Sequence, residues 1–198
     1  MKEKEYMRLE SDSIGTMEVP EDAYYGVQAL RAKENFPITG TKLHPVFIKN
    51  LAKIKRAAAI TNRKAGRLKP EIANAIEASA NEVICGMFDK DFIVDGIQGG
   101  AGTSANMNMN EVIANRAIEM LCGKKGDYTI VHPNDHVNMA QSTNDVIPTA
   151  GKLTVLDLLK PLDKSLSLLT DALYDKAAAF DHIVKIGRTQ LEDAVPMR

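Results

Sequence analysis

The sequence has no tryptophan and only two cysteines, and aromatic residues make up 5% of its 198 positions. Aliphatic side chains must therefore fill the core, and two cysteines are too few for a disulfide framework. No apolar run approaches the ~20 residues that a membrane-spanning helix needs. The charged N-terminus (MKEKEYMRLESDS) lacks the apolar stretch of a signal peptide. These absences predict a soluble, cytoplasmic protein in which Cys85 and Cys122 are core residues.

An excess of charge of one sign is also missing. The chain carries 25 basic and 26 acidic side chains, which give a formal net charge of −1. This balance removes the positive surface on which general nucleic-acid binding depends. The sequence therefore predicts neither a nucleic-acid partner nor a membrane partner.

Apolar residues at helical spacing dominate the chain after residue 45, whereas glycine and proline interrupt an irregular stretch of 40 residues at its start. The predicted elements are helices beginning at Pro45 and Pro70, a helix from Ser104 to Leu121, a long helix from Asp145 to Phe180 that bends at Pro161, and one candidate strand at 128–131. Gly66 stands where the first of these helices should end. The predicted fold class is mainly α.

The long helix carries a seam of leucines at Leu162, Leu166, Leu169 and Leu173, spaced four, three and four residues apart. At 1.5 Å per residue, some 35 residues would span roughly 50 Å, which exceeds the diameter of a compact globule of this chain length. The seam therefore predicts helical partners, either from later in the chain or from other subunits.

A glycine-rich stretch, Gly99–Ala105, precedes the third predicted helix. It fits the G-x-G-x-x-A pattern of dinucleotide sites, but no buried strand precedes it and no acidic residue follows ~20 positions later. What remains is a loop that enters a helix N-terminus, with Thr103 and Ser104 at the cap. Free amide donors, hydroxyls and the positive helix end suit a carboxylate. A plain capped turn is the alternative.

A second polar stretch places Ser142, Thr143 and Asn144 at the start of the long helix, where backbone N–H groups lack partners. A capping cluster without further function is again the alternative. His132 and His136 stand four residues apart, but the proline between them breaks the local helix that would align them on a zinc ion. No metal site is predicted.

A third polar stretch begins at Gly187 and by itself indicates only an exposed loop. Taken together and in order, GGAGTSANMNMNEVIANRA, HPNDHVNMAQSTNDVIPTA and GRTQLEDAVPM resemble the aspartase/fumarase superfamily. The opening RLESDSIGTMEVPEDAYYGVQALRAKENF resembles its aspartase branch. The similarity extends from Arg8 to Arg198.

The resemblance implies a mainly α fold with an N-terminal helical lyase domain at residues 1–141, followed by the start of a central long-helix bundle at 142–198. It implies a homotetramer, which would cover the leucine seam. It also implies reversible elimination of ammonia from L-aspartate to give fumarate, with no organic cofactor.

Carried onto this sequence, the superfamily's substrate-binding positions are Thr103, Ser142, Thr143, Asn144, Thr189 and Gln190. The resemblance implies that these segments reach one pocket from different subunits. The superfamily's catalytic base is a serine in a mobile Gly-Ser-Ser loop, and no such stretch occurs in these 198 residues. We therefore expect the chain to be an N-terminal portion, inactive alone, with the base and a substrate-binding lysine beyond Arg198.

Small differences favour an aspartase over a class II fumarase. Gln190 stands where fumarases usually have histidine, Thr143 stands where they have a second serine, and the loop reads Gly-Ala-Gly-Thr-Ser. The stretch 132–135 (His-Pro-Asn-Asp) matches a secondary anion site of fumarases, so that alternative stays open. A non-catalytic helical assembly module is the remaining alternative.

Overall fold

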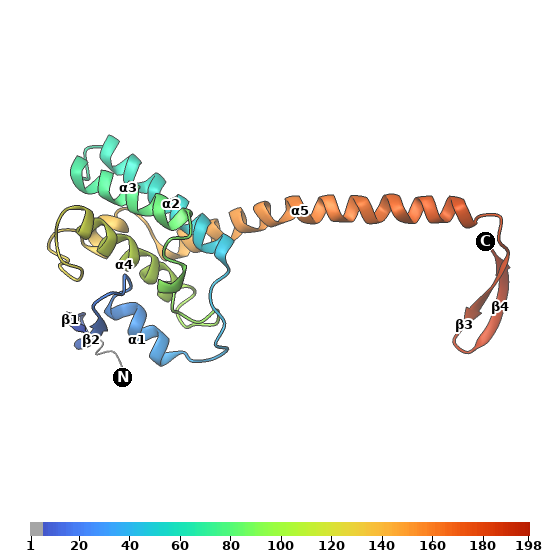
Figure 1. Cartoon of the computed structure of the whole chain (residues 1–198), viewed down its shortest axis with the longest axis horizontal. Coiled ribbons are helices and arrows are strands. Elements are labelled where there is room, and N and C mark those ends of the chain that lie inside the picture. Colours follow the sequence, from blue (N-terminus) through green and yellow to red (C-terminus); the bar gives the residue numbers. More distant parts are fainter. Residues whose placement is uncertain (1–5) are drawn as a thin grey trace. The chain divides into compact units, whose positions relative to one another are not determined.

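The computed structural model describes residues 6–198, which form two compact units that meet between Thr154 and Val155. Helices predominate, as the apolar pattern predicts (Figure 1). Unit 1 contains, in chain order, β1 (Met7–Ser11), β2 (Thr16–Pro20), α1 (Val27–Asn35), α2 (Pro45–Lys64), α3 (Pro70–Ile84), η1 (Asp89–Asp91), α4 (Thr103–Met120), η2 (Pro133–Val137) and the first part of α5 (Thr143–Phe180). Unit 2 contains the rest of α5, β3 (Lys185–Thr189) and β4 (Glu192–Met197). The predicted domain boundary at 141–142 falls at the start of α5 and stays a prediction.

The helix ends in unit 1 follow local rules. Pro45 and Pro70 are the first residues of α2 and α3, because proline's fixed φ suits a first turn whose N–H is unpaired in any case. The stretch after α2 turns at Gly66, whose φ of +68° lies in the left-handed region that glycine adopts without strain. Both predicted helix starts are confirmed.

Residues 6–40 are more ordered than predicted. β1 and β2 form an antiparallel hairpin, and α1 follows it. The guanidinium of Arg8 holds this segment together by donating to the carbonyl oxygens of Pro20 at 2.7 Å, Ala23 at 2.8 Å and Tyr25 at 2.9 Å. A buried arginine thus orders this segment together with a small apolar cluster of Val19, Ala23 and Val27.

Two buried carboxylates hold the start of α1. Glu111 of α4 accepts hydrogen bonds from the backbone N–H groups of Gly26, Gln28 and Ala29, at 2.9–3.0 Å. Glu10 of β1 accepts another from the N–H of Val27 at 3.0 Å. Burial raises the pKa of Glu111 to about 7, against the lowering effect of the three N–H bonds. The four N–H groups at this helix start are therefore paired with side chains.

The core of unit 1 lies between α2, α3 and α4, with η2 and the start of α5 packed against it. α4 is the central helix, because every residue from Ala105 to Asn115 is buried. Met109, Ile113 and Ala117 are fully buried, as predicted. The other buried side chains of this helix include four asparagines, which the apolar pattern did not indicate.

Two local predictions are wrong. Residues 128–131 form a turn and not a strand, because Tyr128 sends its hydroxyl to Glu10, at 2.8 Å, and its backbone pairs within the turn. Cys85 and Cys122 are exposed and not core residues. Cys85 directly follows the end of α3 and Cys122 lies two residues after the end of α4, in turns at the surface.

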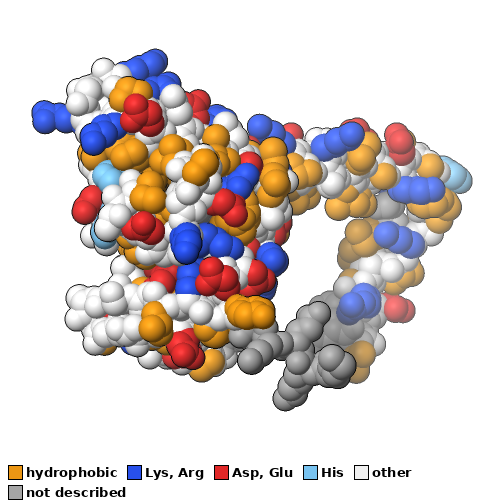
Figure 2. All heavy atoms as spheres, turned by 60° about the vertical axis from the view of Figure 1, so that its left-hand side comes forward, with side chains coloured by type: hydrophobic (Ala, Val, Ile, Leu, Met, Phe, Trp, Pro, Cys, Tyr) orange, Lys and Arg blue, Asp and Glu red, His pale blue; other side chains and the backbone are white. Residues whose placement is uncertain are grey.

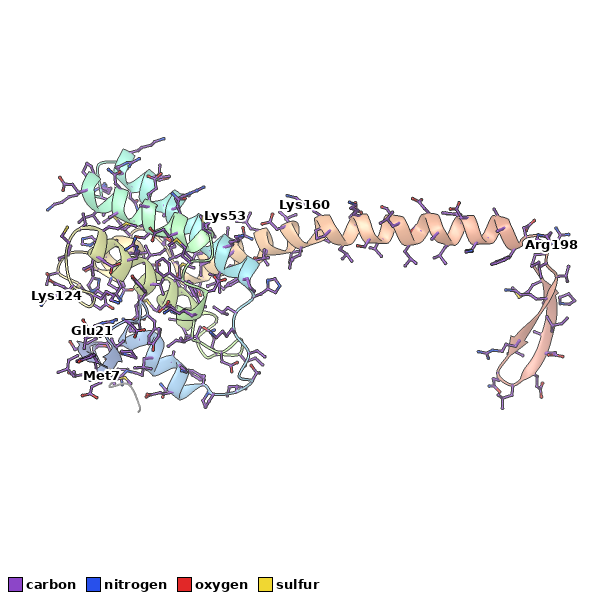
Figure 3. The ribbon with its side chains drawn as sticks, in the orientation of Figure 1. Met7, Glu21, Lys53, Lys124, Lys160 and Arg198 are labelled. Carbon is purple, nitrogen blue, oxygen red and sulfur yellow. The ribbon has the colours of Figure 1, made fainter. Side chains whose placement is uncertain are left out.

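Unit 2 consists of the α5 segment and a hairpin. α5 continues through Pro161, where the sequence predicts a bend. In Figure 3 its ribbon runs on past the neighbouring Lys160 without a sharp kink. β3 and β4 pair antiparallel, so the stretch predicted as an exposed loop is an exposed hairpin. In the described part of the chain, no helix combines the length and the apolarity that crossing a membrane requires.

Leucine side chains of unit 2 are open to solvent. Leu162, Leu166, Leu169 and Leu173 are 51–62% exposed, and Figure 2 shows hydrophobic side chains at the surface of this helix. Such a face is typical of a helix that packs against other helices.

Candidate functional site

The glycine-rich loop bends sharply before α4. Gly100, Ala101 and Gly102 all have positive φ angles, of 75°, 50° and 92°. A Cβ atom at Gly102 would lie 2.8 Å from the side chain of Ile147, so glycine is required there for close packing as well as for its conformation. Because Ile147 belongs to α5, this contact brings the loop next to the start of the long helix.

Thr103 is the first residue of α4 and is exposed. The predicted cap is displaced by one residue, since Gly102 occupies the N-cap position and makes no side-chain hydrogen bond. The hydroxyl of Thr103 instead donates to the carbonyl oxygen of Gly100 at 2.6 Å. The amide oxygen of Gln98 accepts from the N–H of Ala105 at 2.7 Å, so Gln98 supplies the side-chain cap.

The second predicted segment starts α5. Thr143 is its first residue and is half-buried, whereas Ser142 and Asn144 are exposed. The hydroxyl oxygen of Ser142 accepts from the N–H of Asn144 at 3.3 Å. As predicted, the three polar side chains lie at a helix N-terminus, where the helix dipole favours negative charge.

A buried amide joins the two segments. Asn106, in the first turn of α4, donates to the hydroxyl oxygen of Thr143 at 3.1 Å and to the side-chain oxygen of Asn138 at 3.1 Å. The N-terminal turns of α4 and α5 are therefore neighbours. Two helix N-termini with adjacent hydroxyls can bind one carboxylate each, or the two carboxylates of a small dicarboxylate.

A buried lysine contacts the same asparagine, Asn138, that accepts a hydrogen bond from Asn106. Lys55 of α2 is fully buried, and its ammonium donates to the side-chain oxygen of Asn138 at 2.8 Å. Burial lowers the pKa of Lys55 to about 7, because the charged form loses its hydration. Sequence reasoning missed Asn106, Asn138 and Lys55. The available signal was the run of asparagines inside a predicted helix, where asparagine is a poor helix former.

The third predicted segment lies in unit 2. Thr189 is the last residue of β3, and Gln190 follows it at the hairpin tip with a φ of +51°. Both residues are exposed, and the carbonyl oxygen of Gln190 accepts a hydrogen bond from Arg188 at 2.9 Å. The binding roles of Thr189 and Gln190 stay predictions.

The described residues contain no group of three or more His, Cys, Asp or Glu side chains that could hold a metal ion. The Nδ1 atom of His132 accepts from the N–H groups of Asn134 and Asp135, and that of His136 accepts from the N–H of His132. These ring nitrogens hold the η2 turn in place.

Known proteins resemble almost the whole chain. A family described as "Lyase" matches residues 15–198. An aspartate ammonia-lyase of Bacillus subtilis is 52% identical over 196 residues, which cover 99% of this chain and 41% of the relative. A class II fumarate hydratase of Halobacterium salinarum is 54% identical over 192 residues, which cover 96% of this chain and 41% of the relative.

Solved structures also resemble this chain. The structure of a fumarate lyase:delta crystallin from Brucella melitensis has a TM-score of 0.90 and 48% identity, and the match covers 97% of this chain and 45% of that one. The chain thus spans about two fifths of the length of the curated relatives it matches. Because the family match extends from residue 15 to residue 198, the chain belongs to this lyase family.

Proposed function

We propose that this chain contributes substrate-binding segments to an aspartate ammonia-lyase, which eliminates ammonia from L-aspartate to give fumarate. The observation that supports the proposal is the pairing of two helix N-termini, which have Thr103 and Thr143 at their first positions and are joined by the hydrogen bond from Asn106 to Thr143. Aspartate is a small dicarboxylate, which such a pair can hold through neutral donors. Aspartate ammonia-lyases that are 50–52% identical to the chain support this substrate.

The reaction removes a proton from the carbon next to a carboxylate, which passes through a dianionic aci-carboxylate before the amine leaves. Charge therefore grows on the carboxylate oxygens in the transition state. Donors at Thr103, Ser142, Thr143 and Asn144 are suited to stabilise that charge, at about 3–4 kcal/mol for a well-placed donor. Neutral donors fit this task, because they interact more strongly as the charge develops.

The rest of the site comes from elsewhere in the proposed assembly. We propose a cytoplasmic homotetramer, in which Thr189 and Gln190 of one subunit approach the segments around Thr103 and Thr143 of others. The domains of this proposal are residues 1–141 and 142–198, and the general base lies outside the 198 residues. The half-exposed leucines of unit 2 support a bundle of long helices from several subunits.

A class II fumarase is the second candidate. It is supported by the 54% identity to the Halobacterium salinarum enzyme and by a TM-score of 0.86 to a class II fumarase of Schistosoma mansoni. Gln190 and Thr143 favour the aspartase. A non-catalytic assembly module is the third candidate.

The test is a fumarate-release assay on the complete gene product, meaning the protein encoded by the whole reading frame that contains residues 1–198. We expect L-aspartate to yield fumarate and ammonia, and L-malate to be inert. Release of fumarate from malate at a comparable rate would establish the fumarase instead. Turnover of neither compound by a folded protein would support the assembly module.

A further inference from the structure

We propose that Asn106 is a positioning residue that turns the hydroxyl group of Thr143 outwards, so that it donates its hydrogen to the substrate. This inference rests on the proposed function of the same site. Asn106 is 1% exposed, and both of its N–H bonds are used: one reaches the Thr143 hydroxyl oxygen and the other reaches the Asn138 side-chain oxygen, each at 3.1 Å. Asn106 is thus too deeply buried to touch the substrate itself.

The direction of the hydrogen bond decides what Thr143 can do. A hydroxyl group has one hydrogen and two acceptor positions. Because Asn106 donates to the oxygen, the hydroxyl hydrogen of Thr143 is left for another acceptor. Among residues 6–198, the structure shows no acceptor for this hydrogen. Thr143 is half-buried at the start of α5, so a carboxylate oxygen can reach it from solvent.

Lys55 and Asn138 determine the orientation of Asn106. The Lys55 ammonium has only donors, so the Asn138 atom that faces it must be the oxygen. The amide nitrogen of Asn138 donates to the carbonyl oxygen of Gln141 at 3.2 Å, which holds the same orientation from the other side. Asn106 must therefore present its nitrogen to Asn138. The same nitrogen donates to the hydroxyl oxygen of Thr143. The contact with Lys55 thus determines the direction of the hydrogen bonds at Asn138, Asn106 and Thr143.

A buried acceptor without a partner supports this interpretation. The side-chain oxygen of Asn106 is buried and has no hydrogen-bond partner among the described residues. A native structure keeps few such atoms, and each needs an explanation. Reversing the amide would turn this oxygen towards the Asn138 oxygen, which has no hydrogen to donate, and would draw the hydroxyl hydrogen of Thr143 inwards. The orientation that leaves the oxygen unpaired is the one that points the hydroxyl of Thr143 outwards.

The test is a double-mutant cycle in the complete gene product, with kcat and KM for L-aspartate as readouts. The variants are Asn106→Leu, Thr143→Val and the pair. We expect Asn106→Leu to lower kcat/KM on the order of 10-fold and Thr143→Val on the order of 10²-fold. If Asn106 acts through Thr143, adding Asn106→Leu to Thr143→Val causes no further loss.

Asn106→Asp gives a signature that a purely structural role does not predict. A carboxylate has the same shape but only acceptors, so it would draw the Thr143 hydrogen away from the substrate. We expect Asn106→Asp to lower kcat more than Asn106→Leu does. When Asn106→Asp is added to Thr143→Val, we expect no further loss of kcat. If Asn106→Leu fails to fold, Asn106→Ser takes its place in the same cycle.

The matched control is Asn108→Leu. Asn108 is fully buried on the same helix, but it bonds the backbone N–H of Ile93 and the carbonyl oxygen of Asp91, each at 2.9 Å. The Asn108→Leu substitution should lower the melting temperature and leave kcat/KM within about 2-fold. Its free-energy effect should add to that of Thr143→Val. If the losses from Asn106→Leu and Thr143→Val multiply, the inference is wrong although the enzyme is an aspartase. A wild-type protein without activity overturns the proposed function, and the inference with it.

Discussion

Asparagine side chains hold the irregular segments of unit 1 against α4. An asparagine amide carries donors and an acceptor like those of a peptide group, so it can pair with loop backbone that forms no ladder. Asn115 shows this in one side chain. It donates to the carbonyl oxygen of Tyr24 at 2.9 Å and accepts from the N–H of Gly126 at 2.7 Å. Asn106 differs from Asn115, because both of its donors reach other side chains and one of these is a predicted substrate contact.

The first prediction concerns Thr103. In the complete gene product, Thr103→Ala should lower kcat on the order of 10²-fold by removing a hydroxyl that turns from the carbonyl oxygen of Gly100 to the substrate carboxylate. The free energy of unfolding should fall by only about 1 kcal/mol, because the lost bond to Gly100 is exposed. Steady-state kinetics and urea unfolding measure the two effects.

The matched control for Thr103 is Thr61→Ala on α2. Thr61 is also exposed, and its hydroxyl donates to the carbonyl oxygen of Ala57 at 2.8 Å. Its loss should change stability to a similar degree and leave kcat unchanged. If the two variants lose stability equally and neither loses activity, Thr103 is only a turn residue.

The second prediction concerns the pH dependence of stability at Lys55. Burial lowers its pKa from 10.5 to about 7, so between these values the unfolded chain holds more protons than the folded chain. The free energy of unfolding should therefore rise as the pH is raised from 7 to 10.5 and be independent of this group below 7. Each pH unit in that range contributes up to about 1.4 kcal/mol.

Urea unfolding between pH 7 and pH 10 measures this slope. Lys55→Met should flatten it, because methionine fills similar space without a titrating group. Lys49→Met is the control, since Lys49 lies on the same helix and is exposed. Equal slopes in the wild type and Lys55→Met would show that the Lys55 ammonium is stabilised in the folded state as well as in water.

At the scale of elements, α1 depends on a carboxylate from another helix. Glu111→Ala, the third prediction, removes the acceptor for three backbone N–H groups and leaves a cavity. Each buried donor left unpaired costs about 1–3 kcal/mol, so the free energy of unfolding should fall by about 3 kcal/mol or more. Urea unfolding tests this directly.

Glu77→Ala provides the comparison. Glu77 lies on α3 in a partly exposed ion pair with Arg63, and such pairs contribute about 0–1 kcal/mol. A loss at Glu111 as small as that at Glu77 would mean that water replaces the carboxylate at the start of α1.

The sequence predicted helices and strands correctly where local backbone rules determine them. It failed where charged side chains are buried and apolar side chains are exposed. In β1 the buried positions are the charged Arg8 and Glu10, whereas Leu9 is 71% exposed. An apolar pattern therefore points to the wrong face, and the strand was missed. The β3–β4 hairpin was missed for a related reason, because all six residues of β4 are exposed and none marks a buried face.

At the scale of the whole molecule, the leucine seam of unit 2 gives the fourth prediction. Fully burying a leucine side chain contributes about 1.5–3 kcal/mol, and roughly half of that remains to be gained at each half-exposed seam position. Residues 1–198 alone should therefore self-associate. They should also release no fumarate, because the proposed general base lies outside them. Sedimentation velocity and the fumarate assay measure these two properties.

Paired substitutions test the surface that is responsible. Leu166→Glu with Leu173→Glu introduces charge on the seam and should give a monomer. Lys164→Glu with Ser167→Glu introduces charge elsewhere on the same helix and should leave the association intact. A monomeric wild-type chain would show that the seam is too polar at its edges to hold two copies together.

Local rules in the sequence determined much of this protein. Pro45, Pro70 and Gly66 act on their own backbone, so two helix starts and one helix end followed without knowledge of any distant contact. The mainly α class followed from apolar spacing in the same way. Tertiary packing alone decided that Asn106 meets Thr143, that Lys55 is buried behind them, and that an arginine orders the first strands. These features join residues far apart in the chain, and a side chain's charge, orientation and partners there depend on which segments fold against it.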